Sequence, residues 1–392
     1  MFLGCSFDNS EWTLATLSTK LGGLGLRKTE LHSPAAYLAS QVSCHELCPK
    51  LDKNFKWEPN NNQSDSFIAL NKFNNIVRED QRLGTIDNSY PRQQDLSRRI
   101  DDFTLDMLKD AHKNNGHYLA HLNLITASGA GAWLHAVPSS SLSTQVDPLI
   151  YRTMIQRRLR APIFESNTHC PFCDEILDVH GDHCLVCSCR GDRTKRHNLL
   201  RNEVFFFCNS AGLNPELERP GLLQPRPLAG ITQESGSTRD PNENRRPADI
   251  YLPRWRRGTP AALDFAVTSG LRVDLVKNSA QNSSSATEAY ERLKRSYLNT
   301  EENCRAEGIS FIPVICEADG GGWGPAAHKI WSELVQTKAF LTGEQNSTVA
   351  NRLLQSRPYT VKMLDQSFAI SVVIQTRILD TFWLLHLFVT QA

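Results

Sequence analysis

Two short stretches of β-forming residues, each with one aspartate, place the strongest constraint on the fold of this chain. The first stretch, residues 250–252, follows Asp249 directly. The second, residues 261–267, contains Asp264, and fourteen residues separate the two acids. A segment containing glycine and proline lies between the stretches, so we expect an antiparallel hairpin that brings the carboxylates together.

A close pair of carboxylates favours a divalent cation, because two negative charges repel each other unless a positive charge lies between them. A hard cation such as Mg²⁺ or Mn²⁺ takes oxygen ligands and can assist attack on a phosphodiester. Arginines at positions 245, 246, 254, 256 and 257 surround the acids in the sequence and favour a substrate that contains phosphate. The alternative is that Asp249 and Asp264 end a hairpin and face water, since aspartate is common at turns.

The cysteine-rich segment is the strongest signal from spacing alone. Five of the 11 cysteines lie within residues 170–189, which is metal-ligand spacing and not a disulfide framework. Four protein ligands would leave no open position on a zinc ion, so we expect a structural zinc site. The residues with the spacing of a tetrahedral site are Cys170, Cys173, His183 and Cys187.

The spacing assigns the last two ligands, His183 and Cys187, less firmly than the first two. Asp182 is expected to orient the imidazole of His183 without binding the metal. The interpretation without a metal is a set of buried free thiols. The alternative ligands are His180, Cys184 and Cys189.

The charge of the chain is balanced overall but basic in places. Lys+Arg 43 against Asp+Glu 42 gives a net charge of +1, so the total does not indicate a nucleic-acid partner. Local basic runs matter more for phosphate binding, although a charge run can also be a solvated surface. His197 is expected either to contact phosphate or to make a local hydrogen bond. The full set of candidate nucleic-acid contacts is Arg193, Arg196, His197, Arg246, Arg254 and Arg256.

Composition and the N-terminus exclude two broad classes of protein. The 392 residues, with 40% hydrophobic content, suffice for two or three globular domains. The first residues lack the basic start and apolar core of a signal peptide, and no uncharged apolar run approaches the ~18 residues of a membrane span. We expect a protein that is neither secreted nor in a membrane, and that lies in the reducing nucleus or cytoplasm.

The predicted order of elements after the cysteine-rich segment is helix, three strands, helix, strand and helix. Pro313 predicts that the fourth strand lies at an edge of the sheet, because proline cannot donate to a neighbouring strand. The predicted segments are a helix near 196–211, a strand near 215–218, the two aspartate-bearing strands, a helix near 285–297, a strand over 309–316 and a helix up to about 340.

Helix signals elsewhere in the chain come from capping residues and from apolar spacing. Ser285 with Glu288 predicts a capping box. The helix that follows is expected to have an apolar side made by Ala286, Tyr290, Leu293 and Tyr297. In the N-terminal part, Ser-Pro at 33–34 predicts a helix start, and residues 93–113 have the spacing of an amphipathic helix.

These motifs together resemble site-specific non-LTR retrotransposon proteins over about residues 20–340. The segment with Cys-Pro-Phe-Cys at 170–173, Gly-Asp-His at 181–183 and Arg-His-Asn at 196–198 resembles their zinc segment. Arg-Pro-Ala-Asp at 246–249 with Asp-Phe-Ala-Val-Thr at 264–268 resembles their restriction-like endonuclease. Weaker likenesses are Gly-Gly-Leu-Gly-Leu at 22–26, similar to the region just past the reverse-transcriptase palm, and Gly-Ala-Gly-Ala-Trp-Leu-His at 129–135.

The resemblance implies a nuclease of the Asp…(Asp/Glu)-x-Lys superfamily, an α/β protein with an α-β-β-β-α-β core. Asp249 and Asp264 would be its metal ligands. The lysine usual two residues after the second acid is absent, and Ala266 stands there. The resemblance places the lysine on the following helix, where Lys294 lies, and Glu218 is a candidate third acid.

The function implied is a metal-dependent DNA endonuclease that nicks double-stranded DNA with Mg or Mn, with element RNA as a second partner. The rival is a catalytically dead nucleic-acid-binding zinc protein, left by decay or domestication of the element. No aromatic-x-Asp-Asp polymerase motif occurs, so we expect the chain to begin after the palm. The expected domains are a thumb-like helical remnant (1–60), a helical linker region (61–165), a zinc module (166–195), an endonuclease domain (196–342) and an unassigned tail (343–392).

Overall fold

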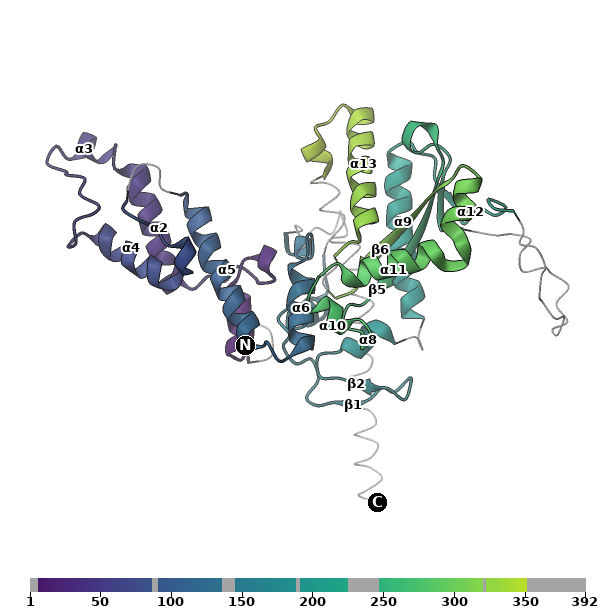
Figure 1. Cartoon of the computed structure of the whole chain (residues 1–392), viewed down its shortest axis with the longest axis horizontal. Coiled ribbons are helices and arrows are strands. Elements are labelled where there is room, and N and C mark those ends of the chain that lie inside the picture. Colours follow the sequence, from purple (N-terminus) through teal and green to yellow (C-terminus); the bar gives the residue numbers. More distant parts are fainter. Residues whose placement is uncertain are drawn as a thin grey trace, which may run out of the picture. The chain divides into compact units, whose positions relative to one another are not determined.

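The computed structural model describes residues 6–86, 91–135, 145–187, 191–224, 247–319 and 322–350. The described chain forms two compact units, one ending at Asn115 and the other beginning at Gly116 (Figure 1). The expected helical linker region, 61–165, is therefore divided between the two units. The tail beyond residue 350 lies outside the described residues.

The N-terminal unit is helical, with a core of aliphatic side chains and Phe73. Residues 93–113 were expected to be a helix, and α5 confirms this. The predicted start of a helix at Ser33 is wrong, because α2 begins at Thr29 and contains Pro34. Proline has no N–H for the Glu30 carbonyl, and the Ser33 hydroxyl lies 3.5 Å from that oxygen instead. The helices are α1 (Asn9–Thr16), α2 (Thr29–Cys44), α3 (Cys48–Leu51), α4 (Asp65–Ile76) and α5 (Gln93–Ala111).

The second unit is a mixed α/β structure. Its main elements follow the predicted order of helix, three strands, helix, strand and helix, with two additional short helices, α10 and α12. The helices are α6 (Gly116–Thr126), α7 (Pro148–Arg158), α8 (Asp182–Val186), α9 (Asp192–Ser210), α10 (Val276–Ser279), α11 (Ser285–Ser296), α12 (Thr300–Ala306) and α13 (Pro325–Thr342). The strands are β1 (Thr168–His169), β2 (Ile176–Leu177), β3 (Glu216–Leu217), β4 (Ile250–Leu252), β5 (Ala261–Thr268) and β6 (Ser310–Glu317).

Four of these strands form one sheet in the order β3-β4-β5-β6. The expected hairpin is confirmed, since β4 and β5 pair antiparallel with Ile250 opposite Leu263. Strand β6 is parallel to β5 and ends the described sheet, as Pro313 predicts. Because successive side chains of a strand point to opposite faces, Asp264, Ala266 and Thr268 share one face of β5.

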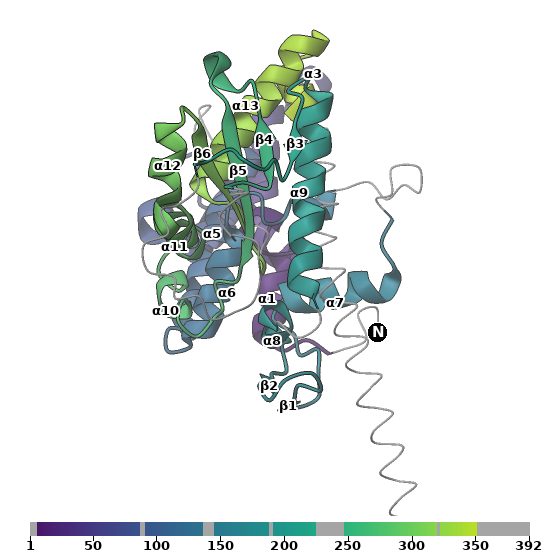
Figure 2. The same ribbon diagram turned by 90° about the vertical axis from the view of Figure 1, so that its right-hand side faces the viewer.

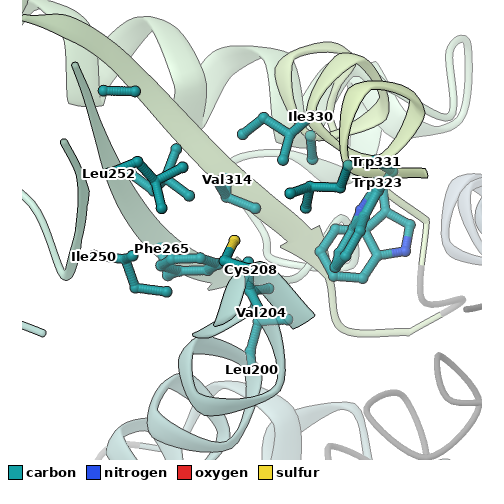
Figure 3. Close-up of a cluster of buried hydrophobic side chains, with 14 of the residues drawn as sticks. Leu200, Val204, Cys208, Ile250, Leu252, Phe265, Val314, Trp323, Ile330 and Trp331 are labelled. Atoms are coloured by element: carbon teal, nitrogen blue, oxygen red, sulfur yellow. The ribbon is translucent and has the colours of Figure 1, made fainter. Parts of the chain in front are cut away.

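Helices cover both faces of this sheet. Figure 2 shows α9 and α11 on opposite sides of the strands. On the α9 side, Leu200 and Val204 pack with Phe265 of β5 and with Trp331 of α13 in one buried cluster (Figure 3). The other face carries Asp264, and α11 and α12 cover it. The acid therefore lies on the face opposite this buried cluster.

A buried network of charges fixes the cysteine-rich segment to the sheet. The fully buried carboxylate of Asp319, just after β6, pairs with Arg157 of α7 and lies 2.8 Å from Nδ1 of His121. Arg157 also donates to Asp182 at 3.1 Å, and Arg160 donates to both oxygens of Asp182 at 2.7 Å. Burial alone would raise the pKa of Asp319, but the charges of Arg157 and His121 outweigh it, so the pKa lies well below its usual value.

None of the helices within the described ranges has the length and apolar character needed to cross a membrane.

Candidate functional site

The two aspartates lie side by side on the β4–β5 hairpin. Asp249 immediately precedes β4, and its N–H donates to the Leu263 carbonyl at 2.9 Å. Its Oδ2 accepts from the backbone N–H of Phe265 at 2.7 Å, so the carboxylate reaches across to the strand that carries Asp264. The side chains of Asp249 and Asp264 are only 19% and 18% exposed. This geometry differs from the alternative of two hairpin-end residues facing water.

A lysine from α11 contacts one of the two acids. Nζ of Lys294 lies 2.9 Å from both carboxylate oxygens of Asp264. Ala266 occupies the same face of β5, two residues after Asp264. The expected reach of Lys294 to the acid pair is confirmed.

A histidine from α9 contacts the other acid. Nε2 of His197 donates to Oδ2 of Asp249 at 3.1 Å. This hydrogen bond is the main reason that the pKa of His197 is raised. The sequence left His197 open between phosphate contact and a local hydrogen bond, whereas this bond joins it to a residue 52 positions away, and the phosphate contact stays a prediction.

The two acids have pKa values displaced in opposite directions. Burial raises the pKa of Asp264 to about 6, although the charge of Lys294 acts against this. Burial also acts to raise the pKa of Asp249, but the bond from His197 and the N–H of Phe265 outweigh it, so that pKa is lowered. Neighbouring groups with perturbed pKa values are characteristic of functional sites, although ion-pair networks also produce them.

The acid pair lines a cavity of about 520 Å³. One wall comes from the cysteine-rich segment through Leu185 and Val186, and another from α11 through Tyr290 and Lys294. The remaining polar or charged lining residues are Arg193, Thr194, Arg196, His197, Asp249, Asp264, Thr268, Ser269 and Arg272. The site is therefore open to a ligand and has basic side chains near the acids.

Glu218, the candidate third acid, is held elsewhere by a salt bridge. Its backbone N–H donates to the Asp249 carbonyl at 2.9 Å, so the two residues are neighbours in the sheet. Its carboxylate, however, pairs with Arg201 of α9 at 2.6 Å and is 46% exposed. Across the described ranges, Glu218 belongs to no compact group of three ligands with Asp249 and Asp264. In this arrangement it does not complete a three-acid site.

The candidate nucleic-acid contacts separate into different environments. Arg193 is exposed and lines the cavity. Arg196 is only 2% exposed and donates to the Leu185 carbonyl at 2.6 Å, so its guanidinium joins α9 to the cysteine-rich segment. Arg196 also lines the cavity, and its contact with nucleic acid stays a prediction.

The expected ring of arginines around the acid pair is not found in the described part of the chain. Arg254 and Arg256 lie in the turn between β4 and β5, at the far end of the hairpin from the acids, and neither lines the cavity. Arg256 instead pairs with Glu333 of α13 at 3.0 Å. Arg245 and Arg246, and the side chain of Arg257, lie outside the described residues. The length of the turn moves its arginines away from the site.

The four expected zinc ligands come together in the structure. The ligand atoms of Cys170, Cys173, His183 and Cys187 all lie within 4.8 Å of one another. Sγ of Cys173 lies 3.3 Å from Nε2 of His183 and 3.9 Å from Sγ of Cys187. Three sulfurs and one imidazole are a common donor set for structural zinc, so this group could hold a zinc ion.

Local backbone structure explains how the ligands meet. The β1–β2 hairpin carries the first pair of cysteines at its turn, where Cys170 N–H donates to the Glu175 carbonyl at 2.9 Å. Gly181, with φ 73°, turns the chain into α8, which presents His183. The side chain of Asp178 accepts from the backbone N–H of His183 at 2.9 Å and holds the start of that helix.

The alternative zinc ligands take different positions. Cys184 is 4% exposed, burial raises the pKa of its thiol, and it lies outside the ligand group. His180 is also outside the group, and Cys189 lies outside the described residues. The expectation that Asp182 orients His183 is wrong, because its carboxylate pairs with Arg157 and Arg160.

The predicted apolar side of α11 is confirmed at Ala286, which is fully buried, but is wrong toward the end of the helix. Leu293 and Tyr297 are 55% and 61% exposed, while Glu291 is buried and accepts from the backbone N–H of Ala326 at 3.0 Å. Glu291 is buried because it binds the first turn of α13, and apolar spacing within α11 cannot indicate such a contact. Tyr290 consequently lines the cavity, one turn before Lys294. The N-cap of α11 is Ser284 and not the predicted Ser285.

No protein-family model and no curated protein matches this chain. The structure defines the protein as mixed α/β with a Cys₃His group that could hold zinc and an acid pair joined to a lysine and a histidine. The likeness to retrotransposon proteins rests on sequence motifs.

Proposed function

We propose that this protein is a metal-dependent DNA endonuclease with a restriction-endonuclease-like core, derived from a non-LTR retrotransposon. The observation that carries the proposal is the acid pair on adjacent strands with Lys294 bound to Asp264. The order of the strands, with α9 and α11 on opposite faces, supports the same assignment. The sequence motifs named above support the retrotransposon origin.

The acids and the lysine can divide the work of phosphodiester hydrolysis. Asp249 and Asp264 would hold Mg²⁺ or Mn²⁺, which supplies positive charge for the phosphate and lowers the pKa of an attacking water. Lys294 lies close enough to Asp264 to donate to phosphate oxygens on which negative charge develops. An ammonium at this position would stabilise the transition state more than the bound substrate.

His197 acts on this site as a positioning residue. Its bond and that of the Phe265 N–H both use Oδ2 of Asp249, so within the described residues Oδ1 is left for a cation. The imidazole also fixes the rotation of the carboxylate. A cation ligand that is already oriented loses less conformational freedom when the ion binds.

The zinc group would serve the nuclease as structural support. Four protein ligands leave no open coordination position for a substrate or a water molecule. The segment nevertheless forms a wall of the cavity through Leu185 and Val186. Arg196 ties the same segment to α9, the helix that carries His197. Loss of zinc is therefore expected to disturb the site indirectly.

Double-stranded DNA is the proposed substrate, and element RNA is a second partner. Arg193, Arg272 and Lys294 place positive charge around the cavity, which suits a phosphate backbone. One observation favours the rival, a catalytically dead nucleic-acid-binding zinc protein. Glu218 is paired with Arg201 and does not join the other two acids, so the site has two carboxylates where a third was expected.

Nicking of supercoiled plasmid separates the two candidates. The purified protein is incubated with plasmid in Mg²⁺, in Mn²⁺ or in EDTA. An endonuclease produces open circles with either cation and none in EDTA, whereas the binding protein retards plasmid or short duplexes without cutting them. Cutting that persists in EDTA would rule out the metal-dependent proposal.

A further inference from the structure

A buried hydroxyl in the cavity has no hydrogen-bond partner in the part of the chain that the structure describes. Thr268, at the end of β5, is 4% exposed, and its Oγ1 makes no hydrogen bond with any described residue. Neighbouring hydroxyls differ: Ser269 Oγ accepts from the Leu271 N–H at 3.2 Å, and Thr287 Oγ1 donates to the Ser284 carbonyl at 2.9 Å. Thr268 thus differs from these two neighbouring hydroxyls, each of which has a partner.

An unsatisfied buried hydroxyl destabilises the folded protein, because the group loses its water partners and gains none. Valine has nearly the same shape and would fill this position without that penalty. Few buried polar groups in native proteins lack a partner, so each one suggests an ion, a water molecule or a ligand that completes it. Thr268 lines the cavity of the acid pair, so a ligand of that cavity is the natural partner.

The position of Thr268 indicates which part of a ligand it would meet. It shares a face of β5 with Asp264 and follows it by four residues, or about 13 Å along the strand. Successive phosphates of one DNA strand are about 3.4 Å apart along the duplex axis. The hydroxyl therefore lies too far along the strand to touch the phosphate at the acid pair and could reach one a few nucleotides away.

The surroundings of Thr268 suit a phosphate oxygen as the acceptor. Arg272 lines the same cavity and uses two of its nitrogens on Asp274, so part of its guanidinium remains for an anion. No carboxylate within hydrogen-bonding distance of Thr268 Oγ1 occurs in the described chain. Ala266, between Asp264 and Thr268 on the same face of β5, also lines this cavity.

We propose that Thr268 is a DNA-positioning residue, whose hydroxyl donates to a backbone phosphate a few nucleotides from the cleaved bond. This inference rests on the proposed endonuclease function and adds a second contact point on the substrate strand. Because Thr268 does not touch the reacting atoms, it acts on substrate binding. Its loss raises KM and leaves kcat nearly unchanged.

The test uses Thr268→Val in the full chain, with Thr268→Ser as the conservative variant and Ser97→Ala as a matched control. Ser97 is fully buried, its hydroxyl likewise has no partner among described residues, and it does not line the cavity. Three quantities are measured: the urea midpoint of unfolding, the Kd for a short duplex in EDTA, and kcat and KM for plasmid nicking in Mg²⁺.

Thr268→Val is expected to keep or raise the urea midpoint and to weaken duplex binding about tenfold, the effect of one hydrogen bond to a charged group. KM rises by a similar factor, Thr268→Ser restores binding, and Ser97→Ala changes neither binding nor KM. A lower midpoint with unchanged binding would show that the hydroxyl has a structural partner and would overturn the inference.

The two proposals can fail separately. If the wild-type protein nicks plasmid and Thr268→Val does so with the same KM, the inference about Thr268 is wrong and the endonuclease stands. If the wild-type protein binds duplex but never cuts it, the endonuclease proposal fails. The Kd of Thr268→Val then still decides whether the hydroxyl contacts DNA.

Discussion

Lys294 and Asp264 form a contact between elements thirty residues apart in the sequence, with Nζ 2.9 Å from each carboxylate oxygen. The lysine comes from α11 and the acid from β5, where Ala266 follows the acid by two residues. The positive charge at Asp264 thus comes from a helix and not from the strand that carries the acid.

Replacing Lys294 with alanine should slow DNA nicking about 10²-fold if the ammonium stabilises charge in the transition state. Duplex binding should change little, because one of many positive charges is lost. Lys277→Ala is the control, since Lys277 is exposed on α10 and does not line the cavity. Single-turnover nicking rates check this, and equal rates for the two variants would remove Lys294 from the mechanism.

The two acids should affect stability with opposite sign in buffer without divalent cations. The folded pKa of Asp264 is raised to about 6, so its ionisation opposes folding as pH rises from about 4 to above 6. Asp264→Asn should therefore raise the free energy of unfolding at pH 7.5, on the order of 1–2 kcal/mol, with the gain vanishing near pH 4.

Asp249 provides the matched comparison. The pKa of Asp249 is lower in the folded protein than in the unfolded chain. Its ionised carboxylate therefore stabilises the fold at any pH above the unfolded-state pKa. This stabilisation is lost as the pH falls through the folded-state pKa. Asp249→Asn should therefore lower the free energy of unfolding at pH 7.5. Urea titrations at pH 4.5 and pH 7.5 measure both variants, and a shift of the same sign at neutral pH would contradict these environments.

The zinc group makes a separate prediction about metal content. Purified protein should contain one zinc per chain, and Cys187→Ser should lose most of it and unfold at lower urea concentration. Cys184→Ser should retain full zinc, because this buried thiol lies outside the ligand group. Elemental analysis distinguishes the two, and loss of zinc from the Cys184 variant alone would reassign the fourth ligand.

The two positions Arg193 and Arg256 should contribute unequally to DNA binding. Arg193 is exposed at the cavity, whereas Arg256 lies beyond the far end of the hairpin and pairs with Glu333. Arg193→Glu should weaken duplex binding severalfold and reduce its dependence on salt, while Arg256→Glu changes both less. Filter binding at several salt concentrations tests this, and a larger effect at Arg256 would place DNA on another surface.

Local signals in the sequence predicted much of this fold. The cysteine and histidine spacing predicted the Cys₃His group, because its four residues lie within eighteen positions of one another. The β-forming stretches on either side of a turn predicted the hairpin, and Pro313 predicted an edge strand. Each of these features depends on residues that are close together in the sequence, and local backbone geometry determines how such residues are arranged.

Contacts between distant elements could not be predicted in this way. The pairing of Arg201 with Glu218 depends on how α9 lies across the sheet, and the burial of Arg196 depends on its contact with α8. Thr268 and Tyr290 were not recognised as cavity residues, because neither a strand threonine nor a helix tyrosine carries a sequence signal for a binding site. Charge near an acid in the sequence proved a poor guide to charge near it in space.

The most direct test of the acid pair as the catalytic centre is the rate of plasmid nicking by Asp264→Asn in Mg²⁺. Glu216→Gln serves as the control, since Glu216 of β3 is a half-exposed acid that pairs with Arg219. The account predicts that Asp264→Asn binds duplex as tightly as the wild type but cuts at least 10³-fold more slowly, while Glu216→Gln cuts normally. Wild-type cutting by Asp264→Asn would contradict the assignment of this site.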